Sequence, residues 1–488
     1  MHAPSDPDLD AVSAWLRAGA GGGTPADEVI ETHIAQVFLI GEHAYKLKRA
    51  VDLGYLDFST AEKRAWAVRR ELDFNRRTAP DIYQAVVPVI RHADGTLGFD
   101  GAGRQLETVL RMRRFDPRAV LANTPEVVEG DFAEALGRQV AGFHAGADIR
   151  KGGAGSLGYV VTSNTAHLRE LAPVLGSEPV EALIAATDAE FARREAELDR
   201  RGAAGQLRRC HGDLHLANIV QEHGRAVLFD CIEFNDTLSE IDVLYDLAFL
   251  LMDLAFRGQG GGANRVLNGY LDEAARSFNE QALRGLGVLP LFLSVRAAVR
   301  AHVTAQQGDG EAARAYVQAA LEHLTWPKPV LYAVGGLSGS GKSTLSRSLA
   351  PGLGGAPGAV ILRSDEIRKR LWGRGPREGL PPEAYAPDQA ARVYGRMLDD
   401  ARIVLQAGRS AILDAVFLRP EERDAAQALA REAGVGFAGF WLEAPAPVMA
   451  ARLDARIGDA SDADARILDE QLKRDPGVVT WRRVDSTR

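Results

Sequence analysis

One feature constrains the fold of this chain most strongly, the run Gly336-Leu337-Ser338-Gly339-Ser340-Gly341-Lys342-Ser343. An apolar, β-prone segment at 330–334 precedes it, and a helical pattern at 344–349 follows it. The spacing G-x-x-x-x-G-K-[ST] between a strand and a helix is typical of a phosphate-binding loop. Backbone N–H groups that turn inward at a helix N-terminus attract anions, so this segment predicts a nucleotide site on a parallel α/β sheet.

The residues of this loop have distinct expected roles in binding ATP and Mg²⁺. Lys342 is expected to place positive charge on the β- and γ-phosphates, where it also serves catalysis, and Ser343 is expected to coordinate Mg²⁺. The glycine backbone is expected to surround the phosphates. The predicted nucleotide-binding residues are Gly336, Ser338, Gly339, Ser340, Gly341, Lys342, Ser343 and Thr344.

Polar side chains follow the next two predicted strands. The segment 359–362 ends shortly before Asp365, which we expect at the carboxyl edge of the sheet as a general base for a substrate hydroxyl. A plain helix N-cap is the alternative role for Asp365. Arg368 lies on the same helix face and is expected to hold an anionic group of the substrate. Asp414, after the segment 411–413, is expected to act on Mg²⁺ or on its water.

Two arginines near the C-terminal end suggest a lid. Arg452 and Arg456 lie one helical turn apart and are expected to close over the transferring phosphoryl group, with a solvated basic helix face as the alternative. With these features, residues 330–485 resemble the small P-loop kinases that include gluconate kinase, chloramphenicol phosphotransferase, zeta toxins and the kinase domain of polynucleotide kinase. The resemblance implies phosphoryl transfer and does not identify the acceptor.

A second group of residues with the chemistry of phosphoryl transfer lies at 211–230. Asp213 and Asn218 are five positions apart (218 − 213) on a predicted irregular loop. The aspartate can accept the proton of an attacking hydroxyl, while the asparagine oxygen holds Mg²⁺. A predicted hairpin then delivers Asp230, the main expected metal ligand. His211 is expected to brace this loop, and His215 either to brace it or to contact the substrate.

These residues resemble the aminoglycoside phosphotransferase group of kinase-like enzymes, through the patterns His-Gly-Asp-x-x-x-x-Asn, Phe229-Asp230 and Asp242-x-x-x-Asp246. Over residues 30–320 the resemblance implies a two-lobed, protein-kinase-like fold. One of the two later aspartates is expected to hold the catalytic loop in place. No G-x-G-x-x-G run follows the first predicted strand, an absence that the aminoglycoside kinases share.

The resemblance also implies roles in the N-terminal lobe. Lys46 and Lys48 share one face of a predicted strand at 44–48, and either of them is expected to contact the nucleotide phosphates. The helix glutamate that pairs with this lysine is expected to be Glu71, with Glu62 as the second choice. The segment 111–115, which includes Met112, is expected to offer backbone N–H and C=O groups to adenine.

The pattern of predicted elements divides the chain. Strands are expected at 37–40, 44–48, 85–90 and 107–112, and a helix that opens at a Ser59/Glu62 capping box is expected to run to about residue 77. Proline at 327 and 329 breaks the helical pattern that dominates 126–324. The predicted parts are a tail or helix at 1–28, a kinase-like N-lobe at 29–116, a helical C-lobe at 117–326 and a P-loop domain at 327–488. The expected fold class is an α+β protein-kinase-like two-lobed domain followed by an α/β P-loop NTPase domain with a parallel sheet.

Composition narrows the partners and the location. The chain has 488 residues, and its 58 basic and 66 acidic side chains give a net charge of −8, so nucleic acid is an unfavoured partner. Only Cys210 and Cys231 occur, and no apolar segment precedes residue 10, which indicates a cytoplasmic protein. The apolar run at 243–256 contains two aspartates and predicts a buried helix rather than a membrane span.

The combined resemblance is to bacterial fusions of an aminoglycoside phosphotransferase-like domain with a P-loop kinase. It implies an ATP- and Mg²⁺-dependent phosphotransferase with two nucleotide sites, each acting on hydroxyls of small molecules. Two alternatives stay open. The C-terminal module can instead phosphorylate nucleic-acid 5′ ends, or the N-terminal half can be a regulatory nucleotide-binding module without turnover.

Overall fold

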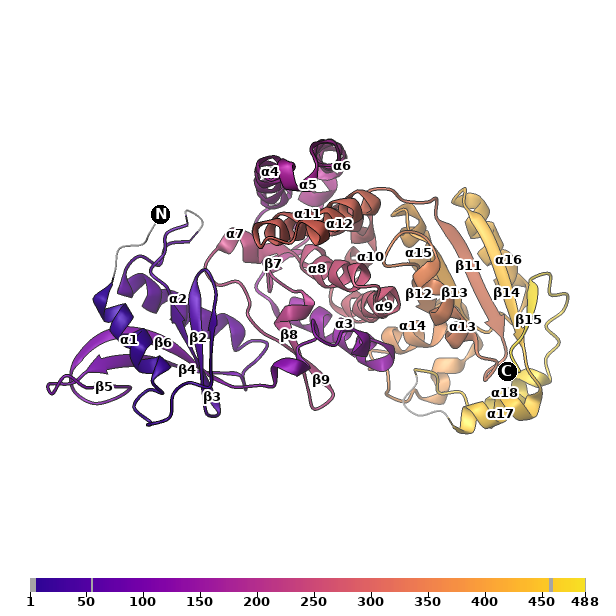
Figure 1. Ribbon diagram of the computed structural model, residues 1–488. Coiled ribbons are helices and arrows are strands. Elements are labelled where there is room, and N and C mark those ends of the chain that lie inside the picture. The colour runs from indigo at the N-terminus through magenta and orange to yellow at the C-terminus, as the bar shows by residue number, and fades with distance from the viewer. Residues whose placement is uncertain (1–5, 54–55, 456–459, 488) are drawn as a thin grey trace. The chain divides into compact units, whose positions relative to one another are not determined.

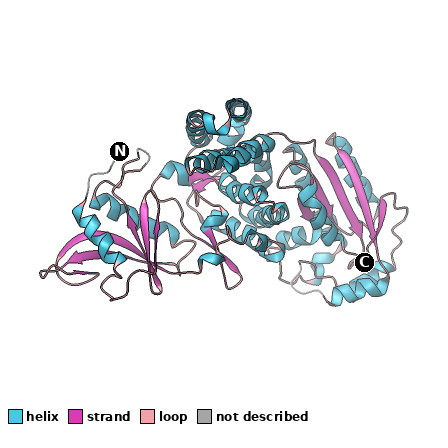
Figure 2. Cartoon of the chain, in the orientation of Figure 1, coloured by secondary structure: helices cyan, strands magenta, loops and turns pink. Residues whose placement is uncertain are grey.

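The computed structural model describes residues 6–53, 56–455 and 460–487. Contacts between residues divide the chain into two compact units. The first unit consists of residues 1–125, 147–150 and 207–246, and the second of residues 126–146, 151–206 and 247–488. Figure 1 labels the helices and strands along the chain, and Figure 2 separates helix from strand by colour.

The first unit contains an antiparallel sheet. Among the described residues it has six strands in the order β1-β2-β3-β6-β4-β5. Successive side chains of a strand point to opposite faces, so each face of this sheet carries its own helix. Their bounds are α1 (Pro7–Arg17), β1 (Glu28–Glu31), β2 (Ala35–Ile40), β3 (His43–Lys48), α2 (Ala61–Asn75), β4 (Tyr83–Arg91), β5 (Leu97–Gly98) and β6 (Arg104–Arg113).

Two apolar clusters hold the helices on this sheet. Val12 and Leu16 of α1 pack with Phe38 on one face. Val68 and Leu72 of α2 pack on the other face, where Leu39, the residue after Phe38, belongs to the same cluster. The alternation in β2 and β3 therefore fixes α2 on the face that also carries Lys46 and Lys48.

The first turn of α2 differs from the sequence prediction. Thr60, rather than Ser59, is the N-cap, and its side chain accepts a hydrogen bond from the N–H of Lys63. The Ser59 hydroxyl instead donates to Asp57 at 2.6 Å. Ser59 and Thr60 both carry a hydroxyl, so either can cap the helix as far as the sequence shows. Because the Ser59 hydroxyl bonds to Asp57, Thr60 becomes the cap.

Two short antiparallel pairs complete the first unit. Strand β7 pairs with β10, and β8 pairs with β9 as the predicted hairpin. The loops before β8 and after β9 carry the residues that were predicted to act on phosphates. The elements are β7 (Leu207–Arg209), β8 (Ile219–Glu222), β9 (Arg225–Leu228), α7 (Asp236–Ser239) and β10 (Glu240–Asp242).

The first part of the second unit consists of helices. Helix α8 begins in the last residues of the first unit and continues into the second. Helices α3 and α9 approach closely because glycines lie between them, and a Cβ on Gly137 would come within 2.1 Å of the Val266 carbonyl oxygen. The apolar run at 243–256 is the buried helix α8, as predicted. The helices are α3 (Gly130–Gly146), α4 (Ala154–Glu170), α5 (Ala172–Leu175), α6 (Ser177–Ala203), α8 (Val243–Phe256), α9 (Gly260–Ser277), α10 (Gln281–Arg284), α11 (Leu289–Gln306) and α12 (Gly310–His323).

The rest of the second unit is an α/β structure with a parallel sheet. The described strands run in the order β12-β13-β11-β14-β15, and every neighbouring pair is parallel. The elements are β11 (Val330–Gly336), α13 (Lys342–Leu349), β12 (Val360–Arg363), α14 (Ser364–Leu371), α15 (Pro387–Gln406), β13 (Ala411–Asp414), α16 (Pro420–Glu432), β14 (Gly436–Glu443), α17 (Ala446–Asp454), α18 (Ala465–Leu472) and β15 (Arg482–Asp485).

None of the described helices is by itself both long and apolar enough for a membrane span. One pair of helical segments, Gln281–Gly287 and Leu289–Gln306, meets the length and composition test only when taken together across a 65° bend.

The close contact of α3 with α9 leads to a stability prediction. Gly137→Ala forces the helices apart and should lower the free energy of unfolding by about 1–3 kcal/mol. Gly142→Ala, in the same helix, is the matched control, because nothing lies within 4 Å of the added Cβ and alanine favours helix. Urea unfolding followed by circular dichroism measures both. Equal effects of the two substitutions would contradict this explanation.

Candidate functional site

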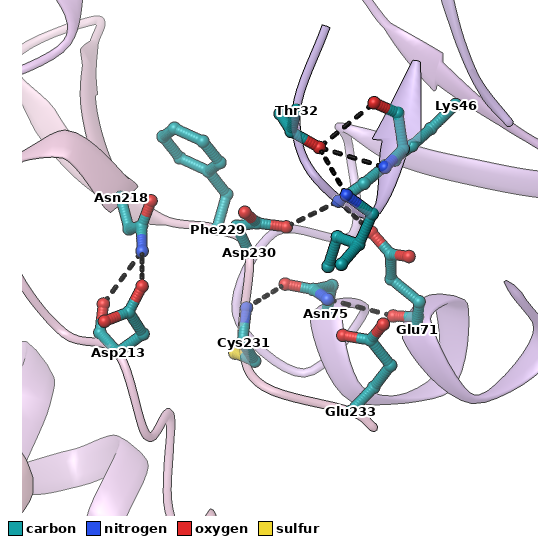
Figure 3. A network of polar contacts seen from close by, with 12 residues as sticks. Thr32, Lys46, Glu71, Asn75, Asp213, Asn218, Phe229, Asp230, Cys231 and Glu233 are labelled. Atoms are coloured by element: carbon teal, nitrogen blue, oxygen red, sulfur yellow. Dashed lines mark hydrogen bonds and ion pairs between the residues drawn. The ribbon is translucent and has the colours of Figure 1, made fainter. Parts of the chain in front are cut away.

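The loop before β8 positions Asp213 and Asn218 against each other. The Asn218 side-chain amide donates to the Asp213 carboxylate and to its backbone carbonyl, each at 2.9 Å (Figure 3). His215 Nε2 lies 3.3 Å from the same carboxylate. These two hydrogen bonds fix the orientation of the Asn218 side chain. The Asp213 carboxylate remains partly exposed, so that an acceptor molecule can reach it.

Buried groups brace this loop from behind. Asp246 accepts hydrogen bonds from the backbone N–H of His211 and of Gly212, at 3.0 and 2.8 Å. The His211 ring lies 2.9 Å, through Nε2, from the carbonyl oxygen of Phe229. The two histidines thus differ: His211 connects the loop to the segment after β9, whereas His215 is next to Asp213.

Asp230 follows β9 in a backbone conformation that few non-glycine residues adopt. Its φ is 62°, and its N–H donates to the Tyr83 hydroxyl at 3.0 Å. Such positive φ angles outside glycine concentrate at functional sites, where the surrounding structure holds them. The Asp230 side chain is 45% exposed and contacts Lys46 Nζ at 2.8 Å.

Two lysines of β3 share one carboxylate. Lys46 Nζ contacts Glu71 at 2.6 Å as well as Asp230, whereas Lys48 Nζ contacts Glu71 at 2.6 Å and Glu233 at 2.7 Å. Lys46 is therefore the lysine next to the expected metal ligand Asp230 (Figure 3), whereas the Lys48 side chain is buried. Glu62, the second choice for the helix partner, is exposed in the first turn of α2.

The electrostatics of this network follow from its burial. Burial alone would raise the pKa of Glu71, but the two lysine charges lower it to about 2. Burial and the nearby Glu71 charge raise the pKa of Glu233, against the attraction of Lys48. Burial disfavours the charged form of Lys46, but Asp230 and Glu71 raise its pKa well above the ordinary lysine value. Lys46 is therefore a permanent cation beside the aspartate.

Sequence reasoning missed several residues of this network. Asn75 accepts from the Cys231 N–H at 2.8 Å and donates to the Glu71 carbonyl, so it connects α2 to the segment that carries Asp230. Glu233 was also missed. Asn75 lies four residues after Glu71 and thus on the same helix face, which is the one available signal.

Met112 lies inside β6, which ends one residue after the predicted strand end at 112. Its side chain is buried with Leu39 and Leu110 in the cluster under α2. The next two N–H groups, of Arg113 and Arg114, already donate to the Ile82 and Glu42 carbonyls. These backbone donors of the predicted adenine segment are thus used within the lobe.

The oxygen groups in this unit fit Mg²⁺. The amide of Asn218 and the carboxylate of Asp230 are hard oxygen donors, the type that Mg²⁺ prefers. Asp230 is held by its backbone and remains exposed enough to bind a ligand.

The second unit contains the phosphate-binding loop in a cavity of about 720 Å³. Gly341 precedes α13 with a φ of 88°, and Lys342 begins that helix. A Cβ on Gly339 would come within 2.5 Å of the Met449 carbonyl oxygen, so only glycine fits there. The predicted residues that line the cavity are Ser338, Gly339, Gly341, Lys342, Ser343, Thr344, Asp365, Arg368, Asp414 and Arg452. Gly336 and Ser340 are buried beside it.

The carboxyl ends of β12 and β13 bring charged groups to this cavity. Asp414 is 4% exposed, and its Oδ2 has no hydrogen-bond partner among the described residues, although it lies 3.6 Å from Arg363 Nε. A buried carboxylate oxygen without a donor, in a cavity with Ser343, fits a Mg²⁺ ligand. Asp365, in the first turn of α14, lines the same cavity.

Arg368 has an unusual environment in this cavity. Its side chain is buried, and its guanidinium lies 4.9 Å from the centre of the Tyr385 ring. Nη1 donates to the Ala384 carbonyl at 2.8 Å, whereas Nε is buried without a hydrogen-bond partner. An unpaired buried donor next to Asp365 is suited to an anionic ligand.

The two predicted lid arginines cannot both be described. Arg452, in α17, donates to the Ser486 carbonyl at 2.5 Å and lies 3.5 Å from the Gly339 carbonyl oxygen. Arg456 lies outside the described residues. In the described state Arg452 therefore connects α17 to the phosphate-binding loop.

The lysine–carboxylate network leads to a stability prediction. Glu71→Gln removes a buried charge shared by Lys46 and Lys48, and should lower the free energy of unfolding by about 3 kcal/mol at pH 7. Glu62→Gln, exposed on the same helix, should lower it by about 0.5 kcal/mol or less. Urea unfolding at pH 7 compares the two variants.

The pH dependence distinguishes an ionic contribution from a packing one. The pKa of Glu71 is about 2 in the folded protein and near 4.5 in the unfolded chain. Ionised Glu71 therefore stabilises the protein fully above pH 4.5, and this contribution is lost as the pH falls from about 4.5 to about 2. Glu71→Gln should lack this component. A variant that loses stability on acidification as steeply as the wild type would contradict the assignment.

Comparisons with known proteins agree with this division of chemistry. Residues 44–286 match the phosphotransferase enzyme family, and residues 331–475 match an AAA domain family. Over 481 residues the chain is 32% identical to an uncharacterized protein of Mycobacterium tuberculosis, covering 95% of this chain and 93% of that protein. A Mycobacterium bovis protein matches to the same extent.

Two further proteins match parts of the chain. An adenylyl-sulfate kinase of Myxococcus xanthus is 33% identical over 117 residues, which are 24% of this chain and 59% of that protein. A glucosamine kinase solved in complex with glucosamine, ADP and inorganic phosphate is 14% identical, covers 66% of this chain and 82% of its own, and has a TM-score of 0.37. Because the match to the mycobacterial proteins spans nearly the whole of both chains, this chain belongs to one family with them, and it is itself a kinase-type enzyme in which a phosphotransferase domain of kinase-like fold precedes a P-loop domain.

Proposed function

We propose that this chain is a bifunctional, cytoplasmic kinase that transfers the γ-phosphoryl group of ATP to hydroxyls of small molecules at two separate sites. One observation carries the proposal. Each compact unit contains its own complete set of groups for phosphoryl transfer, namely a lysine for the phosphates, oxygen ligands for Mg²⁺ and an aspartate for the acceptor. Neither set borrows a residue from the other.

In the first site, the oxygen of the acceptor hydroxyl forms a bond to the γ-phosphorus, and Asp213 accepts the proton of that hydroxyl. The bond from that phosphorus to the bridging oxygen of ATP breaks, and ADP leaves. Lys46 holds the phosphates, while Asn218 and Asp230 would hold Mg²⁺. When bound, Mg²⁺ neutralises charge on the phosphate oxygens. Glu71 keeps Lys46 in position for this role.

In the second site, the loop backbone and Lys342 hold the phosphates, and Ser343 with Asp414 would hold Mg²⁺. Asp365 accepts the acceptor proton, and the same bonds form and break. The burial of Asp414 and its unpaired oxygen support the metal assignment, and the shared cavity supports the pairing of Asp365 with the loop.

The experiment that tests this proposal measures phosphorylated products from a library of sugars, amino sugars, nucleosides and hydroxy acids. Wild type is compared with Asp213→Asn and Lys342→Ala. Each substitution should reduce the products of its own site by about a hundredfold or more, because it removes a group used in the transition state, and should spare the products of the other.

Mass spectrometry of the products distinguishes the alternatives. Loss of every product in Lys342→Ala, with no effect of Asp213→Asn, would make the first unit a regulatory module. Phosphorylation of oligonucleotide 5′ ends would favour the nucleic-acid alternative. Against it, several arginines between residues 363 and 396 are paired with carboxylates: Arg370 with Asp400, Arg374 with Glu378, Arg377 with Asp131 and Arg396 with Asp400.

The environment of Arg368 gives a prediction about the acceptor of the second site. Matched pairs, such as an aldonate and its alditol, or a nucleoside monophosphate and its nucleoside, differ in one anionic group. Wild type should prefer the anionic member. Arg368→Gln should raise the KM for the anionic member about tenfold, because it removes a charged hydrogen bond. KM for the neutral member and for ATP should stay unchanged. An increase in KM for ATP alone would place Arg368 on the nucleotide instead.

A further inference from the structure

The outer strand of the P-loop sheet is paired along its free edge by side chains of an earlier helix. Strand β12 has β13 on one side only. On the other side, Asn268 of α9 accepts from the Ile361 N–H at 2.7 Å and lies 3.3 Å, through Nδ2, from the Ala359 carbonyl oxygen. Asn264, 1% exposed, donates to the Ala359 and Pro357 carbonyls at 3.0 and 2.9 Å. All of these residues belong to the second compact unit.

An ion-pair chain holds the helix that follows this strand. Glu366 of α14 contacts Arg363 Nη1 at 3.1 Å and Arg138 Nη2, on α3, at 3.6 Å. Arg138 also pairs with Asp272 of α9. Asp272 in turn contacts Arg370, one turn further along α14, at 3.3 Å. Both turns of α14 are therefore connected to α3 and α9.

The elements held in this way carry the acceptor side of the second site. Arg363 ends β12 and lies 3.6 Å, through Nε, from the Asp414 carboxylate. Asp365 lies in the first turn of α14 and lines the cavity with Arg363 and Arg368. By contrast, the phosphate-binding loop lies between β11 and α13, and α13 contacts α3 through another pair, Arg347 with Glu134 at 3.0 Å, which does not involve α14. A shift of α14 would thus move the aspartate and leave the phosphate cradle in place.

We propose that Asn268, Arg138 and Glu366 are positioning residues of the P-loop site, through which α3 and α9 hold Asp365 and Arg363 against the phosphate cavity. This inference rests on the proposed function of that site. It predicts that the acceptor side of the P-loop kinase depends on helices that precede residue 326. Binding of ATP by the loop should not depend on Asn268, Arg138 or Glu366.

The charges around Glu366 support this role. Burial, together with the nearby Asp272 charge, raises the pKa of Glu366 to about 7, although Arg363 and Arg138 oppose this increase. The carboxylate is thus half-ionised near neutral pH, and its attraction for the two arginines depends on the proton. The groups that face it or its partners are Arg363 on β12, Arg138 and Glu134 on α3, Asp272 on α9, Arg370 on α14, and Asp400 and Arg396 on α15.

Hydrogen–deuterium exchange of the full-length protein tests the positioning directly. In Asn268→Ala and Arg138→Met, exchange in residues 360–371 should increase relative to wild type. Protection of residues 338–349 by ATP and Mg²⁺ should occur at the same ATP concentration in all proteins. Glu273→Gln is the control, because Glu273 lies on α9 and pairs at the surface with Arg276. Unchanged exchange at 360–371 in both variants overturns the proposal.

Turnover at the second site gives the functional arm. The kcat for products that Lys342→Ala abolishes should fall in Arg138→Met by on the order of ten- to a hundredfold, since small misplacements of catalytic groups have such effects. KM for ATP should not change. An equal loss of ATP protection at 338–349 would show general unfolding and overturn the proposal. If wild type has no such products, the proposed function fails, and the exchange at 360–371 still decides the positioning.

A pH profile separates positioning from mere structural support. In wild type, kcat at the second site should fall as the pH drops below about 7, because protonated Glu366 no longer attracts Arg363 and Arg138. Glu366→Gln should have a low kcat that lacks this step, and Glu366→Asp should restore part of it. A profile of Glu366→Gln with the wild-type step overturns the role of this carboxylate.

Discussion

An outer β-strand exposes N–H and C=O groups that must find partners, and the architecture of this protein depends on how β12 meets that requirement. The amide of Asn268 pairs with a backbone group 93 residues later in the chain. With this contact and the ion pairs of α14, the helical region and the P-loop sheet become one compact unit. The boundary between the two family matches therefore differs from the boundary between the two compact units. The compact units separate residues 1–125, 147–150 and 207–246 from the rest.

The two sites solve the same electrostatic problem differently. In the first unit, side chains provide the charge, and Lys46 is neutralised by Glu71 and Asp230 before any nucleotide binds. In the second, the proposed phosphate contacts come mostly from glycine-rich backbone, and Lys342 adds one charge. The first arrangement requires a buried network with every partner in place, because an unpaired buried charge is costly. The second requires glycines where a Cβ would collide, as at Gly339.

The sequence predicted the parts of each site that lie close together along the chain. The phosphate-binding loop, the Asp213 and Asn218 loop, the hairpin before Asp230 and most strands follow from local spacing. Alternation placed Lys46 and Lys48 on one face, but the choice between them depends on where α2 and Asp230 lie in three dimensions. Asn75, Glu233, Asn264 and Asn268 escaped prediction for the same reason, since their partners are distant in sequence. The Thr60 cap depends on competing local hydrogen bonds that spacing cannot rank.

The asparagines beside β12 have a consequence for any fragment of this protein. A polypeptide that starts at residue 327 retains the complete loop motif, yet it leaves the outer edge of β12 uncovered. An uncovered strand edge is a template for pairing with a second chain, so such a fragment is prone to self-association through that edge. A fragment of this chain with a covered P-loop sheet is thus longer than the motif suggests, because it includes α9, which carries Asn264 and Asn268.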